Sequence, residues 1–122
     1  MEQIVIGIVG PCAAGKTTLT ENLRALGYNV KHIAQEHSYV PDMWRRTAHP
    51  DKLIYLDVSY GISKIRRRLN WTLDEYQKQI NRLHHAREQA DCYIDTDNLT
   101  KGEVLRLAIE YLENSTLDRN KP

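Results

Sequence analysis

The chain has 122 residues, of which 41% are hydrophobic and 27% are charged, and its formal net charge is +1. This length predicts one domain with its own core, and the composition is that of an ordinary globular protein rather than a disordered or fibrous one. The near-neutral charge argues against a dedicated nucleic-acid-binding surface, and the apolar run at the N-terminus is too short for a signal peptide or a membrane span.

The first predicted elements are a strand over Ile4–Val9 and a helix over Thr17–Leu26. The strand is a short apolar run rich in β-branched residues, as expected of a buried parallel strand. The helix has leucines at helical spacing and ends before Gly27. Between the two lies the pattern G-x-x-x-x-G-K-T, which is typical of a phosphate-binding loop, or P-loop, when it joins a strand to a helix.

The chemistry of such a loop depends on these residue types. Glycines let consecutive backbone N–H groups point into one concavity, and the helix adds its positive end. Lys16 is expected to reach the β- and γ-phosphates of ATP or ADP, and Thr17 to offer its hydroxyl to Mg²⁺. The alternative is a glycine-rich turn with an exposed lysine. The residues expected to contact the nucleotide are Gly10, Pro11, Cys12, Ala13, Ala14, Gly15, Lys16, Thr17 and Thr18.

The two cysteines, Cys12 and Cys92, lie far apart without metal-ligand spacing. A disulfide at Cys12 would disturb the phosphate-binding loop, so we expect a reducing, cytoplasmic location. The histidines form no metal signature, and among them only His37 follows a candidate acidic residue at a strand end.

The other elements alternate along the chain. Strands are predicted over Tyr28–Ala34, Leu53–Val58 and Cys92–Ile94, and helices over Ile62–Leu69, from Thr72 to about Ala90, and from Thr100 to residue 113. Capping boxes mark the last two helix starts, at Thr72 with Glu75 and at Thr100 with Glu103. Gln35–Pro50 is predicted to be a loop with a helical turn around Asp42–Arg46. Residues 1–113 are expected to form the domain, and 114–122 a polar tail that frays.

Strands that alternate with helices predict an α/β fold, a three-layer sandwich with about four parallel strands between helices. Ligands of such sheets bind at the carboxyl ends of the strands. The residues that follow each strand are therefore the functional candidates.

With these motifs the chain resembles the nucleoside- and nucleotide-kinase group of P-loop NTPases. Leu53–Ser59 followed by Arg66–Leu69 resembles the strand and arginine-bearing lid of these kinases, which include adenylate kinase. The stretch Thr72–Asp95 resembles dephospho-coenzyme A kinase, and Asp95–Thr100 resembles the loop before their last helix. The resemblance implies a P-loop fold, Mg-ATP as cofactor, a small-molecule phosphoryl acceptor, and nucleotide contacts from Asp97 and Asn98 near the adenine.

These kinases usually have five core strands and are longer, and a central strand missing here usually carries the carboxylate behind the Mg²⁺ ion. Asp57 matches that carboxylate by local pattern, but its strand corresponds by order to the later, lid-preceding one. A right-handed crossover can place the second strand beside the first. Gln35 and Glu36 then stand where the carboxylate belongs, and we favour Glu36 over Asp57. The alternative is that both are solvated strand-end residues.

Charged residues elsewhere are candidates for catalysis. At least one of Arg66, Arg67 and Arg68 is expected to neutralise charge on the transferring phosphoryl group, unless this helix is a solvated basic face. Glu36 is also the candidate acceptor base, although one carboxylate cannot easily serve both the metal and the acceptor. Arg45 and Arg46 belong either to an acceptor site or to a surface turn. The two tryptophans, Trp44 and Trp71, are expected to anchor a core or an interface.

We therefore expect an ATP-dependent phosphotransferase acting on a small molecule. The alternatives are a nucleotide-binding module with little turnover and a slow NTPase coupled to a partner. No N-K-x-D sequence supports guanine specificity. A sheet with few strands is also expected to cover an edge by forming a homodimer, an expectation that leaves the oligomeric state open.

Overall fold

The computed structural model describes residues 3–67 and 70–119, with side chains as far as residue 115. Its centre is one sheet of four strands in the order β2-β1-β3-β4. Every neighbouring pair of strands is parallel, so the carboxyl ends of all four meet at one edge. The strands are β1 (Val5–Val9), β2 (Asn29–His32), β3 (Lys52–Asp57) and β4 (Cys92–Asp95).

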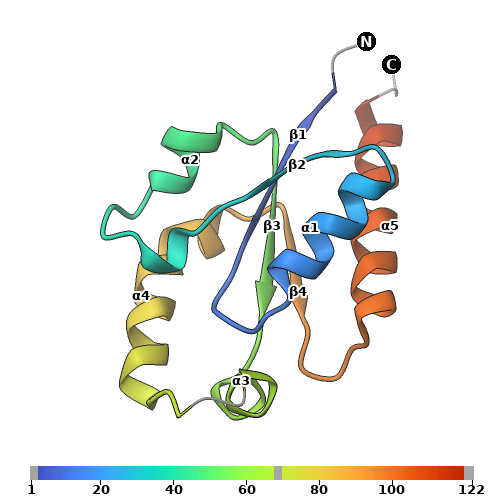
Figure 1. Cartoon of the computed structure of the whole chain (residues 1–122). Coiled ribbons are helices and arrows are strands. Elements are labelled where there is room, and N and C mark those ends of the chain that lie inside the picture. Colours follow the sequence, from blue (N-terminus) through green and yellow to red (C-terminus); the bar gives the residue numbers. More distant parts are fainter. Residues whose placement is uncertain (1–2, 68–69, 120–122) are drawn as a thin grey trace.

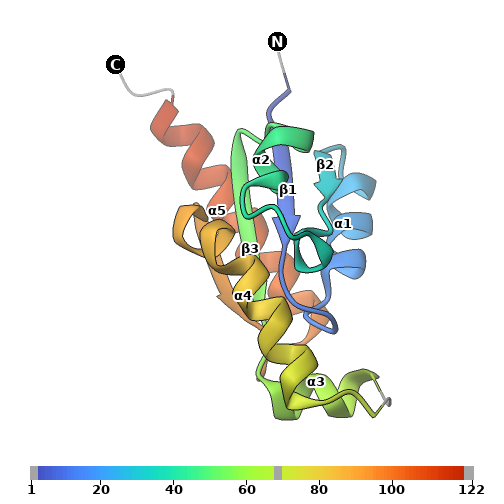
Figure 2. The ribbon, with the colours of Figure 1, turned by 90° about the vertical axis from the view of Figure 1, so that its left-hand side faces the viewer.

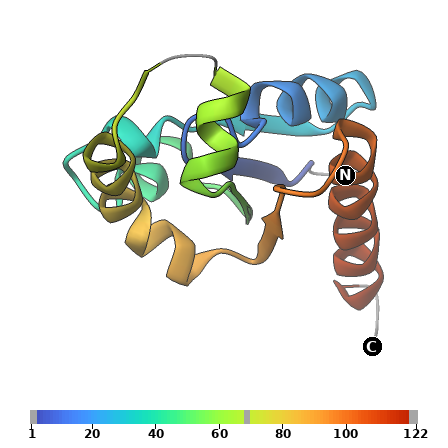
Figure 3. The same cartoon turned by 90° about the horizontal axis from the view of Figure 1, so that it is seen from below.

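Helices cover both faces of this sheet (Figures 1 and 2). One face carries α1 (Lys16–Ala25) and α5 (Lys101–Arg119), and the other carries α2 (Met43–Ala48) and α4 (Leu73–Gln89). The short 3-10 turn η1 (Gln35–His37) follows β2. Seen from below, α3 (Tyr60–Arg67) lies across the carboxyl ends of the strands (Figure 3). The predicted α/β architecture with four parallel strands between helices is confirmed.

The strand pattern explains why both faces are apolar. Side chains alternate between the two faces of a strand. On β3, Ile54 and Leu56 pack in the cluster shared with α1 and α5, whereas Leu53 and Tyr55 pack in the cluster shared with α2 and α4. All four side chains are at most 1% exposed. Because helices cover both faces of the sheet, residues on both faces of β3 are apolar, and the strand appears in the sequence as a continuous apolar run.

Both predicted N-caps are present, and the capping box at Thr100 has its two reciprocal hydrogen bonds. The Thr72 hydroxyl accepts a hydrogen bond from the Glu75 backbone N–H at the start of α4. At the start of α5, Thr100 accepts from the Glu103 backbone N–H while the Glu103 carboxylate accepts from the Thr100 N–H. Each cap contributes about 1 kcal/mol of helix stability.

The expected pairing of β2 with β1 is also confirmed, with Ile8 opposite His32 in the register. Both tryptophans are buried, as expected of core anchors. No helix in residues 3–67 and 70–119 is long and apolar enough to cross a bilayer.

Some boundaries differ from the prediction. The helix in the loop after β2 is a six-residue element rather than one turn. The last helix continues to Arg119 instead of ending at residue 113, because the sequence holds no glycine or proline between there and Pro122 to stop it. Arg68, one of the three candidate arginines, lies outside the described residues.

Candidate functional site

The glycine-rich loop joins β1 to α1 at the carboxyl edge of the sheet. A Cβ at Gly10 would lie 2.1 Å from the Leu56 backbone oxygen, so only glycine permits this approach to β3. Gly15 is the N-cap of α1 with a left-handed φ of 97°, and a Cβ there would meet nothing within 4 Å. Ala13 also has a positive φ, of 71°, which costs an L-residue about 1–2 kcal/mol. The loop therefore combines strained backbone with an open outer side, a combination that clusters at functional sites.

Lys16 is the first residue of α1 and is buried against the loop. Its Nζ donates to the backbone oxygens of Gly10 at 2.7 Å and Pro11 at 3.1 Å. It also pairs with Glu36 Oε2 at 2.8 Å. Glu36 is 4% exposed, and its Oε1 has no hydrogen-bond partner among the described residues. Glu36 thus balances the charge of Lys16 and keeps one buried acceptor atom free.

The position of Glu36 is fixed by polar contacts of η1. The Gln35 side chain donates to the Val40 oxygen and accepts from the Trp44 N–H at 2.8 Å. Arg82 on α4 donates to the Glu36 backbone oxygen at 3.2 Å. The turn after β2 is therefore held from both sides, which gives the Glu36 carboxylate a defined direction.

A cavity of about 320 Å³, called here the loop cavity, opens beside this ion pair. Its lining residues are Cys12, Ala13, Gly15, Lys16, Thr17, Thr18, His32, Glu36 and Arg67. Burial and the nearby charge of Lys16 lower the pKa of His32 below its usual 6.5. Backbone N–H groups at the start of α1 and the Lys16 ammonium favour an anion here.

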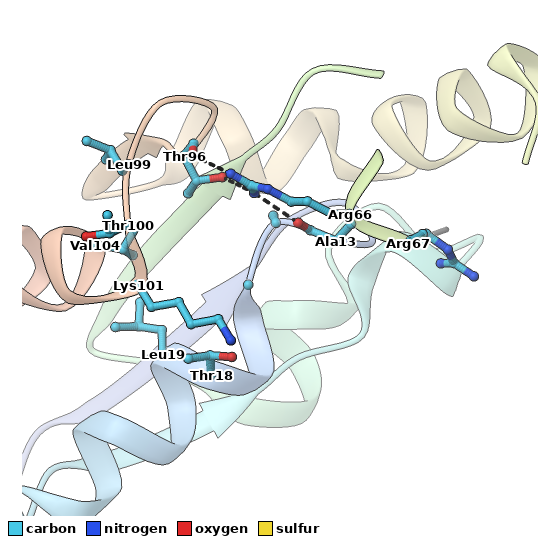
Figure 4. Close-up of a pocket in the computed structure, with 12 residues that line it drawn as sticks. Ala13, Thr18, Leu19, Arg66, Arg67, Thr96, Leu99, Thr100, Lys101 and Val104 are labelled. Atoms are coloured by element: carbon cyan, nitrogen blue, oxygen red, sulfur yellow. Dashed lines mark hydrogen bonds between the residues drawn. The ribbon is translucent and has the colours of Figure 1, made fainter. Parts of the chain in front are cut away.

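A second cavity of about 530 Å³, called here the α1–α5 cavity, adjoins the loop from the other side (Figure 4). Its lining residues are Ala13, Ala14, Gly15, Thr18, Leu19, Arg66, Arg67, Thr96, Leu99, Thr100, Lys101 and Val104. Much of this lining is aliphatic, with hydroxyls and cations between. The two cavities have Ala13, Gly15, Thr18 and Arg67 in common, so they adjoin each other at the loop.

The two described candidate arginines differ in their contacts. Arg66 donates to the Ala13 oxygen at 3.1 Å and to the hydroxyl and backbone oxygen of Thr96, so it ties α3 to the loop and to the end of β4. Arg67 extends away from Arg66 (Figure 4) and its guanidinium lies 5.2 Å from the Trp71 ring centroid. Its buried Nε has no hydrogen-bond partner among the described residues. Arg66 is thus engaged by the protein, whereas Arg67 lines both cavities and its Nε has no acceptor in the described part of the chain.

Several predicted site residues lie elsewhere. Asp57 accepts hydrogen bonds from the Val58 N–H at 2.9 Å and from the Tyr93 hydroxyl, and it lines neither cavity. Asp97 accepts from the Ser59 N–H at the start of α3. Neither Asp97 nor Asn98 lines the α1–α5 cavity; their neighbours Thr96 and Leu99 do.

The candidate acceptor residues Arg45 and Arg46 also lie outside both cavities. The Arg45 guanidinium stacks 5.2 Å from the Trp44 ring centroid, and Arg46 pairs with Asp42 at 3.0 Å. These contacts are those of a surface helix.

Sequence reasoning missed Gln79 on α4. Its Oε1 accepts from the Cys12 N–H at 2.9 Å, and its Nε2 donates to Cys12 Sγ at 3.1 Å. Gln79 is buried on the side of α4 that faces the core. A glutamine among the apolar residues of this helix face was the sequence signal that could have identified it.

No family model matches this chain, and no curated protein matches it.

Proposed function

We propose that this chain binds a magnesium nucleotide at the Gly10–Thr17 loop and is an ATP-dependent phosphotransferase acting on a small molecule. The observation that carries the proposal is the complete motif between β1 and α1, with Lys16 and Thr17 lining a cavity that adjoins a larger, mostly aliphatic one. Phosphates fit the loop cavity because backbone N–H groups, the helix end and Lys16 all favour negative charge.

Residues of the loop cavity fit Mg²⁺. This ion takes oxygen ligands and keeps several of its waters. Thr17 is exposed at the start of α1, and the buried Glu36 Oε1, which has no partner in residues 3–67 and 70–119, can accept from a metal-bound water. When bound, Mg²⁺ supplies charge neutralisation on the phosphate oxygens. We assign Glu36 rather than Asp57 to the metal, because hydrogen bonds from Val58 and Tyr93 already engage the carboxylate of Asp57.

The α1–α5 cavity suits the nucleoside part of the ligand. Its volume falls within the range of small-molecule sites, and such sites combine apolar walls with a few polar groups. Leu19, Leu99 and Val104 offer aliphatic surface to a flat base, and the hydroxyls of Thr96 and Thr100 offer hydrogen bonds. Base contacts are thus assigned to these residues instead of Asp97 and Asn98.

Phosphoryl transfer in this arrangement depends on positioning and charge. Lys16 and Arg67 are the cations of the loop cavity, where the phosphates would lie. The Arg67 Nε has no acceptor among the described residues, and a guanidinium can strengthen its contact as charge develops on the transferring group. Arg67 is therefore our candidate for the arginine that stabilises the transition state.

Calorimetric titration with Mg-ADP tests nucleotide binding. Lys16→Met should weaken ADP binding by about 1.5–3 kcal/mol, because it removes a charge-assisted contact. Thr17→Ala should reduce the gain in affinity that Mg²⁺ provides, and this exposed position is safe for folding. Lys78→Met, which removes an exposed lysine on α4, is the matched control. Equal affinity in wild type and Lys16→Met would contradict the assigned site.

Product analysis separates phosphotransfer from its alternatives. ATP is incubated with panels of nucleosides, nucleotides and sugars, and ADP release is followed. ADP that forms only with an acceptor supports a phosphotransferase. ADP that forms without one indicates an NTPase, and absence of ADP with intact ATP binding indicates a binding module.

A further inference from the structure

Three potential metal ligands lie together beside the loop cavity. Cys12 comes from the glycine-rich loop, and Glu36 and His37 come from η1. Their ligand atoms, a thiol sulfur, a carboxylate oxygen and a ring nitrogen, all lie within 4.8 Å of one another. A tetrahedral ion with ligands at about 2.0–2.3 Å holds its donor atoms roughly 3.3–3.8 Å apart. Side-chain adjustments of about 1.5 Å or less would therefore close the site.

The carboxylate of the cluster uses one oxygen in the protein and leaves the other unsatisfied in the described part of the chain. Glu36 Oε2 pairs with Lys16 and lies 3.9 Å from His37 Nε2. Glu36 Oε1 has no hydrogen-bond partner among the described residues, although the side chain is only 5% exposed. A buried carboxylate oxygen without a partner is costly, and a cation offsets that cost. His37 is 60% exposed and can turn toward the cluster without disturbing the core.

The other two ligands are already held in place. Gln79 accepts from the Cys12 N–H and donates to its sulfur, an arrangement that fixes the direction of the side chain. Arg82 and the buried Gln35 hold the backbone of η1. Hydrogen bonds from residues around the ligands orient them in the same way at known protein metal sites.

The donor set identifies the class of ion. Thiolate and imidazole select borderline-soft metals such as Zn²⁺, whereas Mg²⁺ prefers oxygen alone. We propose that Cys12, Glu36 and His37 form a binding site for one Zn²⁺-class ion. Because Cys12 and Glu36 also line the loop cavity, the bound ion borders the phosphate site. That consequence depends on the proposed function, but the metal site itself does not.

Binding is tested on the untagged, metal-stripped chain without nucleotide. Zn²⁺ is titrated by calorimetry, and Co²⁺ is titrated as a coloured substitute for Zn²⁺. We expect one ion per chain and a near-ultraviolet sulfur-to-cobalt charge-transfer band with tetrahedral visible bands. An equal concentration of Mg²⁺ should not displace the ion. Absence of the charge-transfer band in the wild type would overturn the proposal.

Variants assign the ligands. Cys12→Ala should abolish the charge-transfer band, and His37→Ala should weaken binding about tenfold or more, by analogy with the loss of supporting contacts at metal sites. Cys92→Ala and His84→Ala are matched controls that should retain both the band and the affinity. A band that survives in Cys12→Ala, or is lost in Cys92→Ala, contradicts the assignment.

A further variant distinguishes this site from nonspecific thiol binding. Lys16→Met removes the cation that pairs with Glu36, so the ion should bind more tightly because a repulsive neighbour is gone. Weaker or unchanged binding would contradict participation of Glu36. Since none of these measurements uses nucleotide, failure of the metal site and failure of the nucleotide site give different results.

Discussion

Glu36 and Asp57 both stand at the carboxyl edge of the sheet, yet their carboxylates meet different surroundings. Glu36 is buried beside Lys16 and lines the loop cavity. Asp57 lies on the α4 face, where it accepts a hydrogen bond from Tyr93. The register places Tyr93 opposite Tyr55, two residues before Asp57 on the same face. A carboxylate held in this way has fewer lone pairs for a metal or its waters.

The first prediction compares these two acids. Glu36→Gln should reduce the gain in ADP affinity that Mg²⁺ provides, and Asp57→Asn should leave it close to that of the wild type. Glu36→Gln should also lower the free energy of unfolding by about 3 kcal/mol, because a buried lysine loses its counter-charge. Calorimetry with and without Mg²⁺, together with urea unfolding, measures both effects. The reverse ranking for Mg²⁺ would identify Asp57 as the metal carboxylate.

His32 gives a pH-dependent prediction. Burial, Lys16 and Arg24 lower its pKa below 6.5, outweighing the opposite effect of Glu36. The unfolded chain then binds this proton more tightly than the folded one, so the contribution of His32 to stability is complete above pH 6.5. It is lost as the pH falls through the lowered pKa. We therefore expect His32→Gln to lose less stability than wild type between neutral and mildly acidic pH.

Urea unfolding across that pH range measures the difference for His32. His49→Asn removes an exposed histidine outside both cavities and gives the baseline for losing one imidazole. An identical pH slope in wild type and His32→Gln would contradict the prediction.

At the scale of elements, α3 connects the two cavities. Arg66 docks this helix on the loop and on Thr96. Trp71 contacts Ser63 and Arg67 of α3. Its ring also packs against Tyr76 of α4, so Trp71 joins the two helices. Adjacent residues of one helix point in different directions, so Arg66 and Arg67 can serve separate roles. Docking by Arg66 places Arg67 at the boundary of both cavities.

Substitution of the two arginines should therefore affect different properties, turnover for Arg67 and stability for Arg66. Arg67→Ala should lower phosphoryl-transfer turnover by about tenfold or more, equivalent to about 1.4 kcal/mol, with a smaller change in ADP affinity. Arg66→Ala should lower the free energy of unfolding by about 1–2 kcal/mol through its lost hydrogen bonds. Steady-state turnover, ADP titration and urea unfolding of both variants test this, with Lys64→Ala as the control on the same helix. If Arg67→Ala turns over at the wild-type rate, Arg67 does not stabilise the transition state.

Local signals explain which elements were predictable. The capping boxes at Thr72 and Thr100 and the glycine-rich loop each depend on residues a few positions apart, and all were found in the sequence. The carboxyl-edge position of Glu36 also followed, because crossover handedness restricts where a second parallel strand can lie. The predicted end of the last helix, at residue 113, was wrong. The polar composition after that residue was interpreted as fraying, although no helix breaker is present before Pro122.

Contacts between distant segments were not predictable. Cys12 meets Gln79 and His37, and Asp57 meets Tyr93, only because of strand register and the docking of α4. No spacing in the sequence encodes such contacts, so the sequence alone could not bring Cys12, Glu36 and His37 together. Asp97 and Asn98 do not line the α1–α5 cavity, whereas their neighbours Thr96 and Leu99 do. The directions of side chains in a loop depend on how the loop packs, which the sequence does not show.

The whole molecule is needed to form the proposed nucleotide site. The α1–α5 cavity is lined by residues from Ala13 to Val104, which come from the glycine-rich loop, α1, α3, the segment after β4 and α5. An unfolded chain brings none of these segments together, so it should have no comparable affinity for the nucleotide. Binding should then stabilise the fold by its full linkage free energy.

This linkage gives the last prediction. Mg-ADP at about a hundred times its dissociation constant should stabilise the native state by about 2.7 kcal/mol. An unfolding entropy of roughly 2.1 cal/mol/K per residue converts this to a rise in Tm of about 10 °C for a chain of this length. Scanning calorimetry at several ADP concentrations measures the shift, and Lys16→Met at the same concentrations should show a much smaller one. A wild-type shift of only about 2 °C, at a concentration where titration shows saturation, would mean that the ligand also binds the unfolded chain and that the assembled cavities are not its site.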